Sequence, residues 1–213
     1  MRTLILVTIA LFANTSVVAE MQWAEFRDES EFFSANFPSE PTIAEVPYLS
    51  EYGATFPSKV YTVETGGHMY SITVVDFTDA QQAYLALPDK TDEASSQWLW
   101  IYDQLAATSY AARQFRERGG DVTFDAWHHI DMVEGHQLQI RNPDESRTFA
   151  GIYLQNSRLY ILEATVPAGA LPPGLFQQSI SFLDEDGIRI RYNLQPDRSR
   201  TPNAGYLRRR AEQ

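Results

Sequence analysis

Residues 59–75, KVYTVETGGHMYSITVV, contain the clearest structural signal in the chain, because two alternating segments flank the pair Gly66-Gly67. Glycine tolerates the positive φ angles that a two-residue hairpin turn requires. With that turn, Val63 lies opposite Tyr70 and both side chains fall on the same face. The stretch therefore predicts an antiparallel β-hairpin with one buried face.

A second hairpin is predicted for residues 147–155 and 158–166, which flank the pair Asn156-Ser157. In that pairing Tyr153 faces Tyr160. Both faces of these strands are apolar, a pattern typical of central strands that are covered on both sides.

Between the two hairpins, from Thr91 to Arg118, the apolar period becomes that of a helix. One stripe of this helix should pack on the sheet, and it contains Trp98, Ile101, Tyr102, Leu105 and Ala112. Trp100 lies roughly 200° away from the stripe. We therefore expect Trp100 to be exposed and treat it as a candidate partner-binding residue.

The remaining segments extend the sheet. Residues 121–131 and 136–141 are predicted strands joined by a three-residue turn at Val133-Glu134-Gly135, with glycine in the left-handed position. Leu175 to Leu183 is predicted as a short closing helix, and Ile188 to Tyr192 as an edge strand. The predicted fold class is α+β: an antiparallel sheet with a long helix on one face and a short C-terminal helix.

The N-terminus has the pattern of a signal peptide at residues 1–19. A basic Arg2 precedes an apolar run from Leu4 to Ala13, and Val17 and Ala19 occupy the −3 and −1 positions. The run is too short to span about 30 Å of hydrocarbon. We expect cleavage after Ala19, a periplasmic or secreted protein, and no stable membrane insertion after cleavage.

Charge is distributed unevenly along the 213 residues, whose formal net charge is −11. Residues 188–213 contain seven arginines against Asp197 and Glu212, a net charge of +5, which leaves −17 for residues 20–187 once Arg2 is set aside. We expect a single domain at 20–195 and a mobile basic tail at 196–213. Arg208, Arg209 and Arg210 are candidate partner-binding residues. The net negative charge argues against nucleic-acid binding.

The sequence carries no catalytic motif that we recognise. Cysteine is absent, which excludes disulfides and thiolate chemistry, and neither a Gly-x-Ser-x-Gly elbow nor a phosphate loop is present. Acidic clusters, such as residues 184–186, lie in predicted turns and are expected to be solvated loops. We therefore expect no cofactor and a non-catalytic domain, although a dispersed catalytic triad would leave no local motif.

Three histidines lie close together in sequence and raise the question of a metal site. His128 and His129 are neighbours on a predicted strand, so they point to opposite faces. The predicted register puts His128 and His136 on the same face but places His128 opposite Ile140, roughly 13 Å along the strand from His136. That separation is too long for one ion, and we expect no metal site.

The order of motifs also resembles a known fold. Trp23…Phe26, then Phe33-x-x-x-Phe37-Pro38-x-x-Pro41, the hairpin ending at residues 70–76, the long helix, and the segments at 158–162 and 176–182 are similar to exported bacterial domains of unknown function. Their arrangement resembles the PsbP-like α-β-α sandwich over roughly residues 22–183. The resemblance implies a fold and no shared activity.

Three functional hypotheses follow. The first is an exported domain that binds an envelope protein or helps to assemble a complex. The second is a carrier for a small apolar ligand bound between helix and sheet. The third is a hydrolase with an unrecognised site. The sequence indicates neither the partner nor the oligomeric state.

Overall fold

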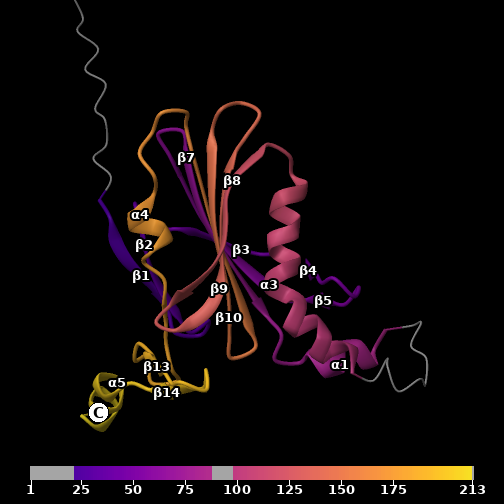
Figure 1. The fold of residues 1–213 in the computed structure, drawn as a ribbon, viewed down its shortest axis with the longest axis vertical. Coiled ribbons are helices and arrows are strands. Elements are labelled where there is room, and N and C mark those ends of the chain that lie inside the picture. Colours follow the sequence, from indigo (N-terminus) through magenta and orange to yellow (C-terminus); the bar gives the residue numbers. More distant parts are fainter. Residues whose placement is uncertain (1–21, 88–97, 213) are drawn as a thin grey trace, which may run out of the picture.

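The computed structural model describes residues 22–87 and 98–212. The predicted leader and the predicted helical residues 91–97 lie outside these ranges. Figure 1 shows the elements, whose bounds are β1 (Ala24–Asp28), β2 (Phe33–Phe37), β3 (Thr42–Glu45), β4 (Tyr48–Leu49), β5 (Thr55–Phe56), β6 (Ser58–Thr65), β7 (His68–Asp76), α1 (Ala80–Leu85), α3 (Leu99–Glu117), β8 (Asp121–Ile130), β9 (Val133–Arg141), β10 (Arg147–Gln155), β11 (Arg158–Val166), α4 (Gly174–Gln177), β12 (Ser181–Phe182), β13 (Tyr192–Leu194), β14 (Arg200–Pro202) and α5 (Ala204–Ala211).

The main sheet has seven strands in the order β3-β6-β7-β11-β10-β9-β8, and each neighbouring pair is antiparallel. Both predicted hairpins are confirmed with their registers: Val63 pairs with Tyr70, and Tyr153 pairs with Tyr160. The central strand β10 is buried on both faces, whereas β11 is buried on the face of Tyr160 and Leu162 and partly buried on the face of Ile161.

The main sheet is the middle of three layers (Figure 1). On one face, the small β1-β2-β12 sheet and α4 enclose an aromatic core that includes Phe33, Phe37 and Phe176. On the other face, α3 and α1 enclose a second core that includes Phe77 and Phe115. The α+β prediction, with a long helix on one face of an antiparallel sheet, is confirmed.

Helix α3 packs through a different face from the one that its large residues predict. Its buried residues are Asp103, Ala107, Ala111, Ala112 and Phe115, whereas Trp98, Tyr102 and Leu105 are exposed. Small alanine side chains allow the helix backbone to approach the sheet closely, and Asp103 is buried because Tyr84 hydrogen-bonds to it. The predicted stripe is wrong except at Ala112 and the partly buried Ile101.

The turn between β8 and β9 also differs from the prediction. It is formed by Asp131 and Met132, both with positive φ, and not by residues 133–135. Gly135 instead lies within β9, opposite His128 and Tyr153 on the neighbouring strands. A Cβ at Gly135 would overlap the Tyr153 ring and the carbonyl oxygen of Ile152, so this glycine makes room for an aromatic side chain.

The C-terminal segments depart further from the sequence-based expectation. The predicted helix at 175–183 is limited to α4, after which β12 pairs with β2. The predicted edge strand at 188–192 does not join the main sheet. Instead, β13 pairs with β14 in a separate ribbon, and α5 follows it. We call residues 188–212 the C-terminal lobe.

Within 196–212, the described part of the segment expected to be a mobile tail, the structure contains strand β14 and helix α5. Helix α5 begins after Asn203, whose side chain accepts hydrogen bonds from two backbone N–H groups. Tyr206 is buried against Ile188 and Ile190, and its hydroxyl donates to Asp184 Oδ2 over 2.9 Å. Arg210 approaches Asp186 Oδ2 within 3.1 Å. The basic segment therefore folds back onto one of the acidic turns of the body.

Candidate functional site

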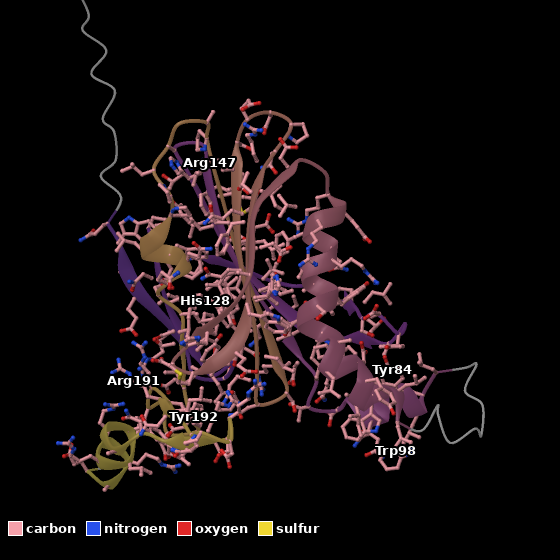
Figure 2. All side chains as sticks on the ribbon, viewed as in Figure 1. Tyr84, Trp98, His128, Arg147, Arg191 and Tyr192 are labelled. Atoms are coloured by element: carbon pink, nitrogen blue, oxygen red, sulfur yellow. The ribbon has the colours of Figure 1, made fainter. Side chains whose placement is uncertain are left out.

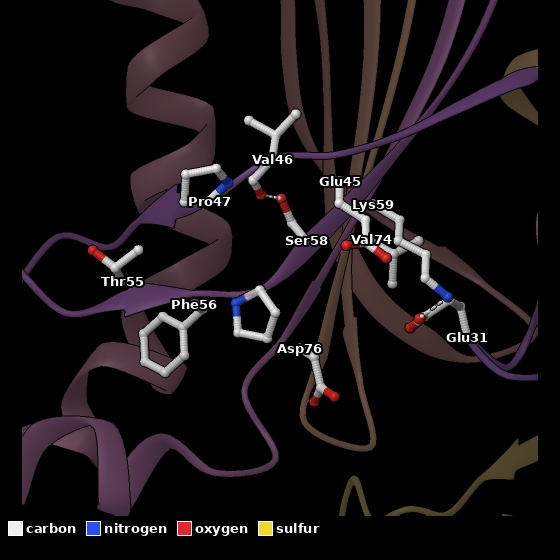
Figure 3. Close-up of a pocket in the computed structure, with 11 residues that line it drawn as sticks. Glu31, Glu45, Val46, Pro47, Thr55, Phe56, Ser58, Lys59, Val74 and Asp76 are labelled. Atoms are coloured by element: carbon white, nitrogen blue, oxygen red, sulfur yellow. Dashed lines mark hydrogen bonds and ion pairs between the residues drawn. The ribbon is translucent and has the colours of Figure 1, made fainter.

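An open cavity of about 430 Å³ lies beside the start of strand β6. Figure 3 shows its two kinds of wall: Val46, Pro47 and Phe56 are apolar, whereas Glu31 and Lys59 are charged. The cavity does not lie between α3 and the sheet, where the carrier hypothesis places its ligand. That space contains the side chains of the second core.

The charged wall is an ion-pair network with its charges largely matched. Lys59 Nζ lies 2.8 Å from Glu31 Oε1, and Arg158 Nε lies 3.2 Å from Glu31 Oε2. Arg158 also reaches Asp76 at 3.4 Å, and Glu31 raises the pKa of Lys59. Because Glu31 is held by two cations, it is a poor general base. The network is suited to fixing the β1–β2 turn against the sheet.

A second buried polar group lies under α3. Asp103 is 1% exposed, and Tyr84 of α1 donates to its Oδ2 over 2.5 Å. Burial raises the pKa of Asp103 despite the hydrogen bonds that favour its charged form. The Asp103 carboxyl group therefore stays protonated to a higher pH in the folded state than in the unfolded chain. The stability contributed by Asp103 is lost as pH rises from 3.8, the ordinary value, through the raised pKa.

This linkage gives a prediction for Asp103→Asn. Asparagine keeps an oxygen that accepts from Tyr84 but carries no charge, so the variant should be more stable than the wild type at pH 7, by about 1 kcal/mol. The difference should shrink toward pH 3.5. Urea denaturation at both pH values measures it, with the exposed Glu185→Gln as the control. The stability difference between the variant and the wild type is compared at the two pH values. A smaller gain for the variant at pH 7 than at pH 3.5 would contradict the burial argument.

The edge strand β8 is the most unusual exposed feature of the described residues. It has ten residues and pairs with β9 on one side, and no other described strand pairs with it. Val122, Phe124 and Trp127 are exposed along it, Trp127 to 73%. Long edge strands are normally blunted by charged residues (above all lysine), proline, a β-bulge or shortness, because their free N–H and C=O groups pair readily with other chains. β8 has an irregularity between Val122 and Phe124, and its charged residues are Asp121 and Asp125. β8 contains neither lysine nor proline.

The opposite edge of the same sheet provides a contrast. Strand β3 has four residues, and Pro41 and Pro47 lie just outside it. A short strand near prolines offers few backbone groups for pairing. The two edges of the sheet are therefore not equivalent, and β8 is the one suited to receive another strand.

A smaller pocket of about 290 Å³ opens at the C-terminal end of β8. Its lining combines Trp127, His128, His129, Met132 and Glu134 with Leu194 of the lobe. The lobe contacts the β8–β9 turn: Arg189 Nε lies 2.7 Å from Asp131 Oδ2, and Tyr192 N donates to the Asp131 carbonyl over 3.3 Å. Figure 2 shows Arg191 and Tyr192 at this junction, below the main sheet.

The structure corrects the predicted placement of the histidines. His136 lies opposite Trp127 on the helix face, where it contacts Asp125, which Arg116 of α3 also binds at 2.7 Å. His128 is on the other face, with Nδ1 3.0 Å from the Tyr153 hydroxyl. The prediction that His128 and His136 share a face is therefore wrong, because the turn lies two residues earlier in the chain.

The four candidate partner-binding residues lie in two separate regions. Trp100 is partly buried against the second core, and its indole N–H is buried without a hydrogen-bond partner among the described residues. The expectation that Trp100 is exposed is wrong. Arg208 and Arg209 are exposed on α5, whereas Arg210 is engaged by Tyr206, Asp184 and Asp186.

Sequence reasoning missed the β8 edge. Its apolar residues were visible, but strand order decides which strand is an edge, and no local pattern specifies that order. The absence of lysine and proline from residues 121–130 was the one available signal.

Comparison with known proteins assigns no relationship: no protein-family model matches the chain, and no curated protein matches it significantly. Among the helices of the described residues, none has both the length and the apolar character needed to cross a bilayer.

Proposed function

We propose that this chain is an exported, non-catalytic domain that binds or helps to assemble other proteins, and that the edge of β8 is its docking surface. The observation that carries the proposal is a ten-residue strand with one free edge and three exposed apolar side chains. Proteins commonly recruit extended segments by adding them as a strand to such an edge. Backbone hydrogen bonds then give affinity, and alternate side chains give selectivity.

The proposal of export is supported by the leader pattern at residues 1–19, and with it we propose a periplasmic or secreted chain whose partner lies in the same compartment. The PsbP-like sandwich is retained as a proposal about architecture alone. It is supported by the main sheet lying between helices α3 and α1 on one face and the small β1-β2-β12 sheet with α4 on the other, and it transfers no activity to this chain.

Co-isolation from an envelope extract tests the docking surface. The full chain, Trp127→Lys and Leu105→Lys would be compared, because Trp127 and Leu105 are both 73% exposed but only Trp127 lies on the edge strand. Lysine on an edge opposes strand pairing. Trp127→Lys should therefore recover at least about tenfold less partner, the equivalent of 1.4 kcal/mol, whereas Leu105→Lys should match the wild type.

Equal recovery by both variants would contradict the proposal. Native mass spectrometry of the same preparations examines the alternative. A bound small molecule without any β8-dependent protein would favour the carrier hypothesis, with the cavity of Figure 3 as its site.

A further inference from the structure

The β8 edge has a sequence that can pair with itself. Strand addition to β8 does not by itself specify the partner. For two identical edges, an antiparallel two-fold arrangement is the simplest, because the free backbone groups of both copies are then paired in one interface. From Phe124 to Ile130 the strand is regular, since its irregularity lies between Val122 and Phe124. Seven residues, 124–130, are therefore available for a continuous ladder.

In such a pair, directly opposed residues must lie on the same face of the sheet. Asp125, Trp127 and His129 lie on the α3 face, as the contact of Asp125 with Arg116 shows. His128 and Ile130 lie on the opposite face, with Tyr153 and the aromatic core. A two-fold axis must therefore pass beside a single residue of the strand, and each choice of that residue defines one register.

The possible registers differ in the charges that they oppose. An axis beside Asp125 would place the two Asp125 carboxylates opposite one another, and an axis beside His128 would oppose Asp125 to Asp131. Directly opposed like charges destabilise a sheet. An axis beside Ala126 would oppose the Asp125 carboxylate to the apolar ring of Trp127. These three registers each contain an unfavourable pair.

An axis beside Trp127 opposes no two carboxylates, and it also pairs Ala126 with His128. Trp127 meets its own copy at the centre, Asp125 of each strand opposes His129 of the other, and Phe124 opposes Ile130. Aromatic and apolar cross-strand pairs each stabilise a sheet by roughly 0.2–1 kcal/mol, and the pairing of Asp125 with His129 avoids the opposed carboxylates of the other registers. All pairs except the central one occur twice, so the small contributions add.

We infer that the partner of the β8 edge is a second copy of this chain, paired antiparallel about a two-fold axis beside Trp127 to form one continuous sheet. This inference rests on the proposed use of β8 as a docking strand and names its occupant. The exposed side chains of Phe124 and Trp127 become cross-strand contacts in the dimer. The net charge of −12 on each mature copy opposes association, so the dimer is expected to be modest in affinity and to need salt screening.

Disulfide trapping tests the register, because the chain has no cysteine of its own. Directly opposed residues have Cα atoms about 4.5–5.5 Å apart, within the range of about 4.4–6.8 Å that a disulfide spans. Under mild oxidation at about 0.15 M salt, Trp127→Cys should form a covalent dimer at least fivefold faster than Leu105→Cys, which places cysteine at an equally exposed position on α3. Equal rates for the two variants would overturn the register.

Sedimentation of the mature chain measures dimerisation while Trp127 is retained. His129→Asp would oppose two pairs of like charges in the dimer and should raise the dimer Kd by roughly tenfold, about 1.4 kcal/mol, whereas His129→Lys at the same exposed position should leave it unchanged or lower. A wild type that remains monomeric up to 100 µM (~100 times a 1 µM Kd) would overturn the second copy as partner. In that case, β8-dependent recovery of another protein would still support the proposed function. If no such protein is recovered either, both the proposed function and the second-copy inference are contradicted.

Discussion

Gly135→Ala should destabilise the protein by at least about 2–3 kcal/mol, the range expected for overpacking a tight site. In most strands, replacing glycine by alanine is neutral or stabilising, because it reduces the freedom of the unfolded chain. At Gly135 the new methyl group would overlap the Ile152 carbonyl oxygen and lie 2.7 Å from Tyr153 Cε1. The Ile152 backbone cannot shift without a large energetic cost, so the steric penalty outweighs the entropic gain.

The affected ring supports the docking strand. The Tyr153 hydroxyl contacts His128 Nδ1 at 3.0 Å and is also reached by Gln137, and burial raises the pKa of Tyr153 to about 12. Displacing the ring should therefore loosen β8 as well as the core. Urea denaturation measures the change in unfolding free energy. Gly174→Ala is the control, because a Cβ there meets no atom within 4 Å. Equal midpoints for the two variants would show that the site is roomier than described.

Tyr206→Ala should release helix α5 from the body. Tyr206 is 6% exposed, packs on Ile188 and Ile190, and donates to Asp184. Truncating a buried aromatic residue typically costs about 3–5 kcal/mol, which exceeds what one short helix and its ion pairs can supply. Trypsin should then cleave at Arg208 and Arg209 about 10- to 100-fold faster, because local opening controls cleavage of a docked segment.

The neighbouring residue on the same helix provides the control. Leu207 is 53% exposed, so Leu207→Ala should leave the cleavage rate close to that of the wild type. The midpoint of global unfolding should change little, because Ile188, Ile190 and Tyr206 form a small cluster of their own in the lobe. Wild-type resistance of Tyr206→Ala to trypsin would mean that other contacts hold α5 in place.

The sequence specifies those parts of the fold whose cause is local. Gly66-Gly67 and Asn156-Ser157 have the positive φ angles that their turns require, and the strands around them pair in the predicted registers. The β8–β9 turn was misplaced because the glycine on which the prediction relied, Gly135, lies within β9, while Asp131 and Met132 adopt the positive φ angles of the turn.

The remaining differences arise from tertiary contacts. Helix α3 buries alanines and leaves Trp98 and Leu105 exposed, because close approach to the sheet outweighs the burial of larger side chains there. The lobe is ordered by one tyrosine and two isoleucines that lie 16 to 18 residues apart in sequence, too sparse to predict a core. The candidate site depends on strand order, which only the assembled sheet reveals.

Hydrogen exchange of the backbone amides in Asp121–Ile130 tests most directly whether β8 is a docking strand. The dilute mature chain would be compared with its assembled form, and strand β3 at the other sheet edge would serve as the internal reference. We predict that the alternate β8 amides that point away from β9 exchange rapidly in the dilute chain and at least about tenfold more slowly on assembly, while β3 amides do not change. Unchanged exchange along β8, with protection appearing elsewhere on the assembled protein, would contradict the account.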